Sequence, residues 1–474
     1  MVEILVLCKF SLKRSTYNTI SKLTFFSFSF VNFCKRNFNM SKAATFERGI
    51  HPKYNKEIAS DKPITQANPP QRIVVPVSQH IGAPAKVEVN IGDEVKKGQV
   101  IGTPAGFVSS PIHSSISGKV VAIADFPTSV GRMVQSVVIE NDGKDESVGF
   151  KENPDYMNLS ADEIKNIIKD AGIVGMGGAA FPTNVKLSPP KEKPIDAVII
   201  NGAECEPYLT ADHRMMAERP KEVVEGLKII MKSLGVKEGY IGIEENKPDA
   251  IEAMKSACAG GSIEVWPLEI KYPQGAEKML IKAIKGREVP TKGLPMDVGV
   301  VVQNVGTALA VYEAVRFGKP LIERVVTITG NGINKPANMM VRIGTLMADV
   351  IEQCGGLAEG AVKVISGGPM MGFAQWTLDV PVVKGTSGIL VLSEDEYVSS
   401  DDYSACIRCG SCIDVCPMGL NPSILSIYAE KGFYEDAKEN NLFDCFECGS
   451  CAFVCPAKRP MVQFMRLAKS QVKP

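Results

Sequence analysis

The sequence of 474 residues lacks a net charge, because 53 lysines and arginines balance 53 aspartates and glutamates. Chains that bind nucleic acid through its phosphates usually carry a basic excess, which is absent here. The sequence also lacks an uninterrupted run of 18 or more apolar residues, which a membrane-spanning helix requires. The most apolar segment, 298–315, contains Gln303, Asn304 and Glu313, so we interpret it as a buried strand followed by a helix. These absences predict no nucleic-acid partner and no transmembrane helix.

Cysteine is concentrated at one end of the chain, where eight of 13 cysteines form two copies of C-x2-C-x2-C-x3-C followed by proline. The first copy is Cys406, Cys409, Cys412 and Cys416, and the second is Cys445, Cys448, Cys451 and Cys455. Soft thiolates suit iron–sulfur clusters, and bacterial two-cluster proteins use this doubled pattern, in which each fourth cysteine ligates the other cluster. We therefore predict two 4Fe-4S clusters, one held by Cys406, Cys409, Cys412 and Cys455, and the other by Cys445, Cys448, Cys451 and Cys416.

Two alternatives use the same residue type. Zinc ribbons usually contain separate C-x2-C pairs instead of runs of four that end in proline, and disulfide scaffolds are typical of short secreted chains. Cluster cysteines must also stay reduced until the metal arrives, which indicates the cytoplasm. We therefore favour iron–sulfur clusters.

Residues 1–39 differ from the rest of the chain. They carry six basic residues against one acidic residue, no glycine or proline, and a serine- and phenylalanine-rich run at 23–33. Such a segment is typical of a signal peptide or an amphipathic anchor. No small-residue cleavage site precedes Met40, and we expect residues 1–39 to be an extension ahead of the true start at Met40.

Residues 40–150 are predicted to form a β sandwich, because short alternating strands with glycine and aspartate turns follow one another from Arg72 to Ile123. The G-D-x-V-x-x-G-Q turn at 92–99 resembles that of the biotinyl and lipoyl carrier fold. Those carriers bear a modified lysine at a hairpin tip, but the matching stretch 103–111 contains no lysine. We therefore expect a structural module, not a swinging arm.

The remainder is predicted to form three further domains, which makes the fold class multidomain α/β. Helix and strand signals alternate over 151–320, as in a layered α/β domain. Over 321–395, strands, an Asn331-Gly332 turn and one helix predict a β-grasp-like domain. Residues 396–474 are predicted to be a ferredoxin-like α+β domain, with a helix at 422–430 between the cysteine runs.

One loop of the α/β domain is rich in glycine and contains Gly175, Gly177 and Gly178, followed by Phe181 and Lys186. Such glycines let backbone N–H groups approach a phosphate or a flat ring, and a lysine adds a point charge. A glycine-rich loop is also common as a tight packing turn. This one follows a helix instead of a strand, so it is not a standard dinucleotide fingerprint.

Three further loops lie where ligands bind in open sheets, at or near the ends of predicted strands. They contribute Asn201, Glu204 and Glu206 from 201–207, Gly275 and Glu277 from 272–278, and Asn304 from 303–307. Cys205 lies between two glutamates, and a small residue in a tight loop explains it better than a redox role. The four loops together predict a nucleotide pocket.

These loops resemble the FMN- and NADH-binding subunit of respiratory complex I, through the glycine loop, N-x-x-E-x-E-P at 201–207, G-x-E at 275–277 and N-V at 304–305. The resemblance implies that Phe181, Glu206 and Glu277 face the nicotinamide nucleotide. It also implies that FMN is bound by Gly175, Gly177 with the adjacent Gly178, Lys186, Asn201, Glu204, Gly275 and Asn304. Ala203 and Ala276 replace acidic residues of that subunit, so the nucleotide contacts can differ.

The complex I subunit ends in a single-cluster domain, unlike this chain. The doubled cysteine pattern, the carrier-like module and the opening F-E-R-G-I-H-P at 46–52 resemble instead the C subunit of the Rnf electron-transport complex. This resemblance implies electron transfer between NAD(H), FMN and two 4Fe-4S clusters, coupled to ion translocation. The partners would be membrane subunits, with ferredoxin reached through one of them, and the place would be the cytoplasmic face of the plasma membrane. The alternatives are a soluble flavin and iron–sulfur corrinoid reductase of a bacterial microcompartment and a ferredoxin-like adaptor without flavin.

Overall fold

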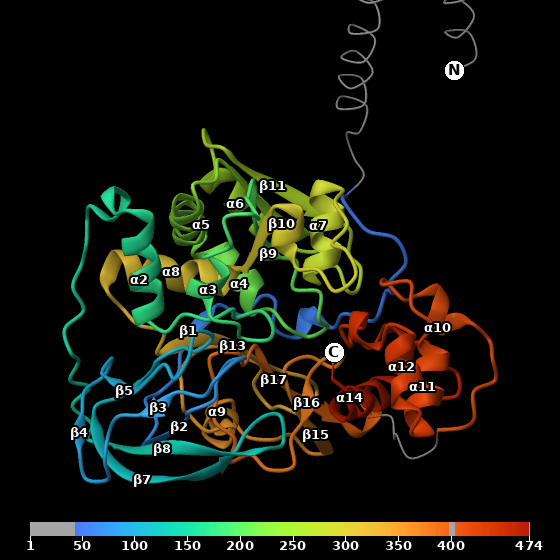
Figure 1. Ribbon diagram of the computed structural model, residues 1–474. Helices are drawn as coiled ribbons and strands as arrows, with labels where there is room; N and C mark the ends of the chain where they lie inside the picture. Colours follow the sequence, from blue (N-terminus) through green and yellow to red (C-terminus); the bar gives the residue numbers. More distant parts are fainter. Residues whose placement is uncertain (1–42, 398–402, 474) are drawn as a thin grey trace, which may run out of the picture. The chain divides into compact units, whose positions relative to one another are not determined.

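The computed structural model describes residues 43–397 and 403–473, so the expected extension at 1–39 lies outside the described residues. The chain divides into two units, 1–43 and 44–474, and the helices and strands of the described residues belong to the second unit. Four sheets are found in the described part of this unit (Figure 1). A search of the same residues for a helix long and apolar enough to cross a membrane found none.

The α/β domain is built on a parallel sheet with the strand order β11-β10-β9-β12. Successive residues of β9 point to opposite faces of the sheet, so Val198 and Ile200 join one hydrophobic core, and Ala197 and Ile199 join another. Helices α2, α5 and α8 pack into the first core and α7 into the second, and Figure 1 shows α5 and α7 on opposite sides of the sheet. Burial of both faces is typical of parallel sheets and confirms the predicted layered fold. The strands are β9 (Ala197–Gly202), β10 (Glu238–Glu244), β11 (Ile263–Leu268) and β12 (Val300–Asn304), and the helices are α2 (Ala161–Asp170), α3 (Thr183–Lys186), α4 (Ala211–Glu218), α5 (Pro220–Leu234), α6 (Pro248–Ala257), α7 (Glu277–Lys285) and α8 (Val305–Phe317).

Helix α2 leads into the glycine loop. Its first turn is closed by a capping box, in which the Ser160 hydroxyl accepts from the Glu163 N–H and the Glu163 carboxylate accepts from the Ser160 N–H. Gly172 follows the helix with a φ of +67°, in the left-handed region that favours glycine. The glycine loop then leads into the one-turn helix α3 before it reaches β9.

The sandwich consists of two antiparallel sheets, β2-β8-β7-β4 and β3-β5-β6, around one apolar core. The hairpin between β5 and β6 corresponds to the tip that carries the lysine in carrier domains. Its end is fixed, because the buried Lys384 of the β-grasp domain donates from Nζ to the carbonyl oxygens of Pro111 and Gly172, both at 2.7 Å. This anchoring supports a structural role for the module. The strands are β2 (Arg72–Pro76), β3 (Lys86–Val87), β4 (Glu94–Val95), β5 (Val100–Thr103), β6 (Ile112–His113), β7 (Gly118–Pro127) and β8 (Met133–Asn141).

The β-grasp domain contains a six-stranded sheet with the order β1-β14-β13-β17-β15-β16. Three of its strands are absent from the sequence prediction: β1 (Ile64–Gln66) at one edge, β16 (Phe373–Ala374) at the other edge and β17 (Gly388–Ser393) in the interior of the sheet. Strand β1 comes from the segment that we assigned to the sandwich, and it pairs in parallel with β14. A local pattern of three residues cannot show which distant edge a strand will join. The other elements are β13 (Glu323–Thr329), β14 (Ala337–Arg342), α9 (Met347–Gln353) and β15 (Ala361–Ser366).

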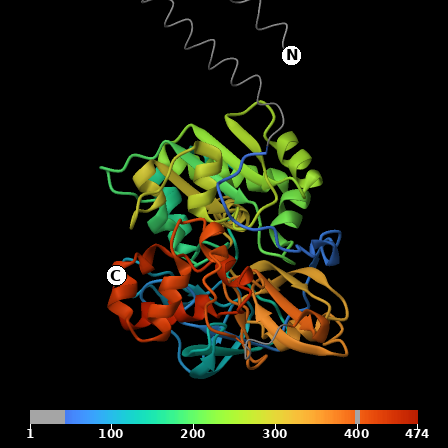
Figure 2. The same ribbon diagram turned by 90° about the vertical axis from the view of Figure 1, so that its right-hand side faces the viewer.

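Residues 44–52, here called the N-terminal strap, also lie outside the sandwich. Ile50 exchanges two backbone hydrogen bonds with Tyr272 of the α/β domain, at 2.8 and 2.9 Å. On its other side the strap contacts the C-terminal domain, because Gly49 donates to the Val415 carbonyl and Arg48 donates to the carbonyls of Ile413 and Cys416. Figure 2 shows this blue segment crossing the α/β domain toward the red helices. The strap therefore joins two domains.

The C-terminal domain repeats one backbone motif. In each cysteine run, a residue and the glycine two positions later have positive φ: Arg408 and Gly410 in the first run, and Glu447 and Gly449 in the second. Each motif leads into a one-turn helix, α10 or α13. Over residues 403–473 the domain contains helices and turns but no strand, whereas we expected α+β. Its helices are α10 (Ser411–Asp414), α11 (Pro422–Glu430), α12 (Tyr434–Glu439), α13 (Ser450–Phe453) and α14 (Met461–Gln471).

Candidate flavin pocket and cysteine rings

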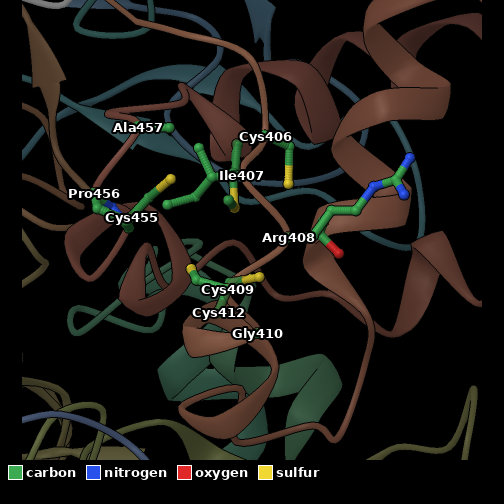
Figure 3. Close-up of a pocket in the computed structure, with 11 residues that line it drawn as sticks. Cys406, Ile407, Arg408, Cys409, Gly410, Cys412, Cys455, Pro456 and Ala457 are labelled. Carbon is green, nitrogen blue, oxygen red and sulfur yellow. The ribbon is translucent and has the colours of Figure 1, made fainter.

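One pocket of the C-terminal domain is lined by Cys406, Cys409, Cys412 and Cys455, here called ring 1. Figure 3 shows the sulfur atoms of these cysteines around a common space, with the Arg408 side chain directed away from it. The fourth member comes from the second cysteine run, which is the crossover that the repeat predicts. The rest of the lining is mostly apolar, and consists of Ile407, Pro456, Ala457 and Met461 together with Arg408, Gly410 and Ser423. Four thiols in an apolar setting fit the ligand set of a 4Fe-4S cluster.

The other four cysteines, Cys445, Cys448, Cys451 and Cys416, are here called ring 2, after the second cluster that the crossover predicts. Burial, followed by the neighbouring Cys448, Cys445, Cys416 and Cys412, raises the pKa of the Cys451 thiol above its usual range. Cys416 and Cys412 of the first run thus both lie near Cys451, and the assignment of Cys416 to the second cluster stays a prediction. Over residues 43–397 and 403–473, no three His, Cys, Asp or Glu side chains are close enough to hold a single metal ion. A cubane is larger than one ion, so its ligands are more widely spaced.

The glycine loop folds back on itself beside the start of α8. Val174 and Pro182 form an antiparallel bridge, and the Gly175 N–H donates to the Phe181 carbonyl at 2.8 Å. The Met176 N–H donates to the Thr307 hydroxyl at 2.9 Å, which fixes the loop to the first turn of α8. The amide groups of the loop therefore lie near a helix N-terminus, where a phosphate is favoured.

The glycines of this loop have different surroundings. A β-carbon at Gly177 would lie 2.8 Å from the side-chain nitrogen of Asn304, whereas one at Gly178 would meet no atom within 4 Å. Gly177 is therefore required by its packing against Asn304. Gly178 borders open space, as expected of a residue that faces a ligand.

Asn201 and Gly275 lie together, as predicted. The Asn201 amide nitrogen donates to the Gly275 carbonyl at 2.7 Å, and its oxygen accepts from the Ala203 N–H at 3.2 Å. The Gly275 N–H in turn donates to the Cys205 sulfur at 3.2 Å. Burial raises the pKa of the Cys205 thiol, which keeps it neutral and favours the interpretation as a small packing residue.

The two glutamates of the 201–207 loop contact protein groups. Both carboxylate oxygens of Glu204 accept backbone N–H bonds from the first turn of α4, from Asp212 at 2.7 Å and His213 at 3.2 Å. Glu206 accepts from the N–H groups of Met370 and Met371 in the β-grasp domain, at 3.1 and 2.8 Å. Both glutamates thus connect elements of the fold, and their predicted cofactor contacts remain predictions.

Lys186 and Glu277 form an ion pair, and both side chains are partly exposed. They were assigned to the FMN phosphate and to the nicotinamide nucleotide, respectively. The ion pair brings the two predicted binding regions together. Phe181 lies five residues before Lys186, just ahead of α3.

Two residues that the sequence analysis missed hold these loops in place. The buried Lys56 donates from Nζ to the carbonyl oxygens of Glu204, Glu206 and Leu209, at 2.6 to 2.9 Å. Asp212 accepts from the Asn304 side chain at 2.6 Å. Asp212 lies in the first turn of α4, five residues after the end of the N-x-x-E-x-E-P run, and this position is an available signal for it. Lys56 gives no such signal, because it lies 148 residues before Glu204.

The pocket loops contact ring 2 directly. The Tyr272 hydroxyl donates to the Cys448 carbonyl at 2.7 Å. Tyr272, Cys205 and Ile50 form a buried apolar cluster that packs against Met370, Val415, Cys448 and Val454. The candidate pocket and ring 2 are therefore joined through packed side chains.

Comparison with protein families matches four consecutive segments. Residues 44–144 match the RnfC barrel sandwich hybrid domain, 168–313 the Nuo51 FMN-binding domain, 325–374 the SLBB domain and 399–456 the 4Fe-4S dicluster domain. The order of the four matches agrees with the order of the predicted domains.

Curated relatives match over nearly the whole chain. The C subunit of the proton-translocating ferredoxin:NAD(+) oxidoreductase complex of Clostridium ljungdahlii is 56% identical over 90% of this chain and 94% of its own length. The C subunit of the Na(+)-translocating complex of Acetobacterium woodii is 50% identical over 91% of this chain and 98% of its own length. The C subunit of the ion-translocating oxidoreductase complex of Rhodobacter capsulatus is 44% identical over 92% of this chain and 84% of its own length. With these identities over most of its length, the chain belongs to the family of C subunits of Rnf-type ion-translocating ferredoxin:NAD+ oxidoreductase complexes.

Proposed function

We propose that this chain is the electron-transfer subunit that connects NAD(H) with the remainder of a membrane-bound ferredoxin:NAD+ oxidoreductase complex. The observation that carries the proposal is the contact between the pocket loops and ring 2, through Tyr272 and Cys448. FMN and two 4Fe-4S clusters are its cofactors, as the matched domains indicate. The flavin supplies the exchange between the electron pair of a nicotinamide and the single electrons of the clusters.

The residues fit these cofactors. FMN would be held by the amides of the glycine loop, the Asn201–Gly275 pair, Asn304 and the nearby Lys186, with Gly178 bordering open space. Ring 1 and ring 2 would each hold one cluster. We place Phe181 and Glu277 at the nicotinamide side of the pocket, and Glu206 is a candidate there because it adjoins the same loops.

The two rings differ in their surroundings, which suggests an order. Cys448 of ring 2 packs against the apolar cluster of Tyr272, Cys205 and Ile50. In ring 1, Cys409 is exposed, and the adjacent Ile407 is 66% exposed. Ring 2 would therefore be proximal to the flavin, and ring 1 would face the electron partner.

Partner subunits would provide the ion translocation. The relatives are named as subunits of ion-translocating complexes, so we propose membrane subunits as partners, with ferredoxin served through one of them. The chain would lie peripherally on the cytoplasmic face of the plasma membrane. A corrinoid reductase finds no support in these comparisons, because the barrel-sandwich match and the relatives all point to the C subunit of an Rnf-type complex.

The test is the absorption spectrum of the full chain, purified without oxygen, before and after NADH is added. We expect about eight irons per chain, one FMN, and bleaching of both flavin and cluster bands. NADH oxidation by a preparation without flavin would refute the pocket, and a bleached flavin beside fully oxidised clusters would refute the connection to ring 2.

A further inference from the structure

Asp212 lies at the centre of the polar contacts between three pocket loops. Its backbone N–H donates to Glu204 at 2.7 Å, and its Oδ2 accepts from the Asn304 amide nitrogen at 2.6 Å. The Asn304 amide oxygen accepts from the Gly306 N–H at 2.8 Å, so the amide is held at both ends. Asn304 in turn forms the surface against which Gly177 packs. One side chain therefore separates the Asp212 carboxylate from the glycine loop.

The charged groups that face Asp212 are of both signs, so its carboxylate is neutralised only in part. The negative group is Glu204 on the loop after β9, and the positive groups are Arg324 on β13 and Lys247 ahead of α6. The donors of the buried Arg324 are directed at backbone carbonyls, including that of Met176 in the glycine loop. Those of Lys247 reach the Ala203 carbonyl, Glu244 and Asn246.

Burial, and after it the like charge of Glu204, raises the pKa of the Asp212 carboxyl to about 7. The Asn304 hydrogen bond and the charges of Arg324 and Lys247 oppose this rise. The two glutamates of the 201–207 loop are placed less well than Asp212 for proton exchange. Both carboxylate oxygens of Glu204 accept from backbone N–H groups, and Glu206 faces the β-grasp domain.

We propose that Asp212 is the proton-holding residue of the flavin pocket, which binds a proton when two electrons enter the pocket and releases it when they leave. This inference rests on the proposed function, because it requires FMN to occupy the pocket. Asp212 acts through Asn304 and is thus a positioning residue with a second, titrating role.

The charge balance explains why such a group is useful. A hydride carries one proton and two electrons, so its arrival from NADH makes the pocket more negative by one charge. This added charge favours protonation of a nearby buried carboxylate, and an O–H bond forms with a proton from water. When the two electrons leave toward ring 2, that O–H bond breaks, and its proton returns to water together with the proton of the hydride. Each NADH then yields one NAD+, one proton and two electrons.

The variant Asp212→Asn isolates the titration. Its side-chain oxygen still accepts from Asn304, but it no longer binds a proton in this pH range. The full-length, flavin-loaded chain is reduced with NADH without oxygen in weakly buffered solution, and an indicator dye reports protons taken up per flavin bleached. At pH 8 we expect the variant to take up fewer protons than the wild type, by up to about one per flavin. At pH 5.5 the two should agree, because the carboxyl is then protonated in both states of the pocket.

A matched control is Asp249→Asn. The Asp249 carboxylate contacts His213, the next residue of α4, at 2.7 Å, but is not bonded to Asn304. This variant should take up protons as the wild type does. Equal uptake by Asp212→Asn and the wild type at pH 8 would overturn the proposal.

A second measurement needs no variant. The infrared difference spectrum of the wild type, reduced minus oxidised at pH 8, should show a deuterium-sensitive carboxylic-acid band, and the absence of this band would also overturn the proposal. The flavin absorbance recorded alongside separates the two levels of inference. Bleaching without the band contradicts only the role of Asp212, whereas a flavin that NADH fails to bleach contradicts the proposed function.

Discussion

The hydroxyl of Tyr272 lies 2.7 Å from the carbonyl oxygen of Cys448 and donates a hydrogen bond to it. Tyr272 belongs to the loop that carries Gly275, and Cys448 is a member of ring 2. The tyrosine is almost completely buried, and the bond that it donates is partly buried. This bond adds a direct polar link to the packed cluster that joins the pocket loops to the cysteine ring.

Tyr272→Phe should loosen this connection. The variant removes the donor of the partly buried Cys448 carbonyl, which costs about 1 kcal/mol of stability. We expect iron and flavin contents to stay unchanged and electron transfer from flavin to clusters to become slower. Stopped-flow absorbance after mixing with NADH measures this rate. Tyr240→Phe is the control, since the Tyr240 hydroxyl bonds to Glu238 on an exposed part of β10. An unchanged rate in Tyr272→Phe would show that the bond does not set the electron path.

The crossover of the fourth cysteines predicts which cluster each variant loses. Cys455→Ser should damage the cluster of ring 1, which Cys455 shares with the first run, and Cys416→Ser should damage that of ring 2. Each variant should retain about four of about eight irons, because serine is a poor ligand for iron–sulfur clusters. Electron paramagnetic resonance of the reduced protein distinguishes the two clusters. If Cys455→Ser instead removed the signal of the cluster held by Cys445, the assignment of the rings would be reversed.

Local patterns predicted much of this fold, because they concern residues close in sequence. The capping box of Ser160 and Glu163 and the alternation along β9 follow from short-range geometry, and both are present. The doubled cysteine spacing likewise predicts that the fourth cysteine of each run lies with the other run. The loops with Asn201, Gly275 and Asn304 were brought together because parallel strands end at one edge of the sheet.

Long-range contacts could not be predicted from such patterns. Arg48 reaches the carbonyls of Ile413 and Cys416 across more than 360 residues, and nothing local to an exposed arginine indicates a partner. Lys56 resembles an ordinary surface lysine in the sequence, yet it is buried against three carbonyls. The carboxylate of Glu206 was expected to face a nucleotide, and only the folded chain shows the Met370 and Met371 amides beside it.

The two adjacent glycines of the pocket loop should respond differently to alanine. Gly177→Ala places a methyl group against the Asn304 side chain, and overpacking of this kind costs about 1–3 kcal/mol. Gly178→Ala meets no protein atom within 4 Å, so the flavin-free protein should keep its stability. If the flavin occupies that open space, Gly178→Ala should still weaken FMN binding. Thermal unfolding of flavin-free protein and fluorescence titration with FMN separate the two effects. Full FMN affinity in Gly178→Ala would place the flavin elsewhere.

The Glu206 carboxyl should make stability depend on pH. Burial raises its pKa from 4.5 to about 7, in opposition to the two backbone N–H bonds and the nearby Lys56. A raised pKa means that the stability contributed by the protonated form is fully present below pH 4.5 and is lost as the pH rises through 7. The loss is about 3.5 kcal/mol at most, since one pKa unit corresponds to about 1.4 kcal/mol. Glu206→Gln should therefore flatten the decline of the unfolding temperature between pH 5 and pH 8.

Glu313→Gln provides the control of opposite sign. Lys319 and Arg219 hold the pKa of Glu313 below its usual range although burial opposes them, so its contribution is present above that range and lost on acidification. That variant should be destabilised most at neutral and alkaline pH, whereas Glu206→Gln should gain most there relative to the wild type. A second measurement on Glu206→Gln separates structure from binding. A raised KM for NADH with unchanged flavin content indicates a contact with the nucleotide. A purely structural carboxyl, bonded only to the Met370 and Met371 amides, would leave the KM unchanged, or its loss would raise the KM and lower the flavin content together.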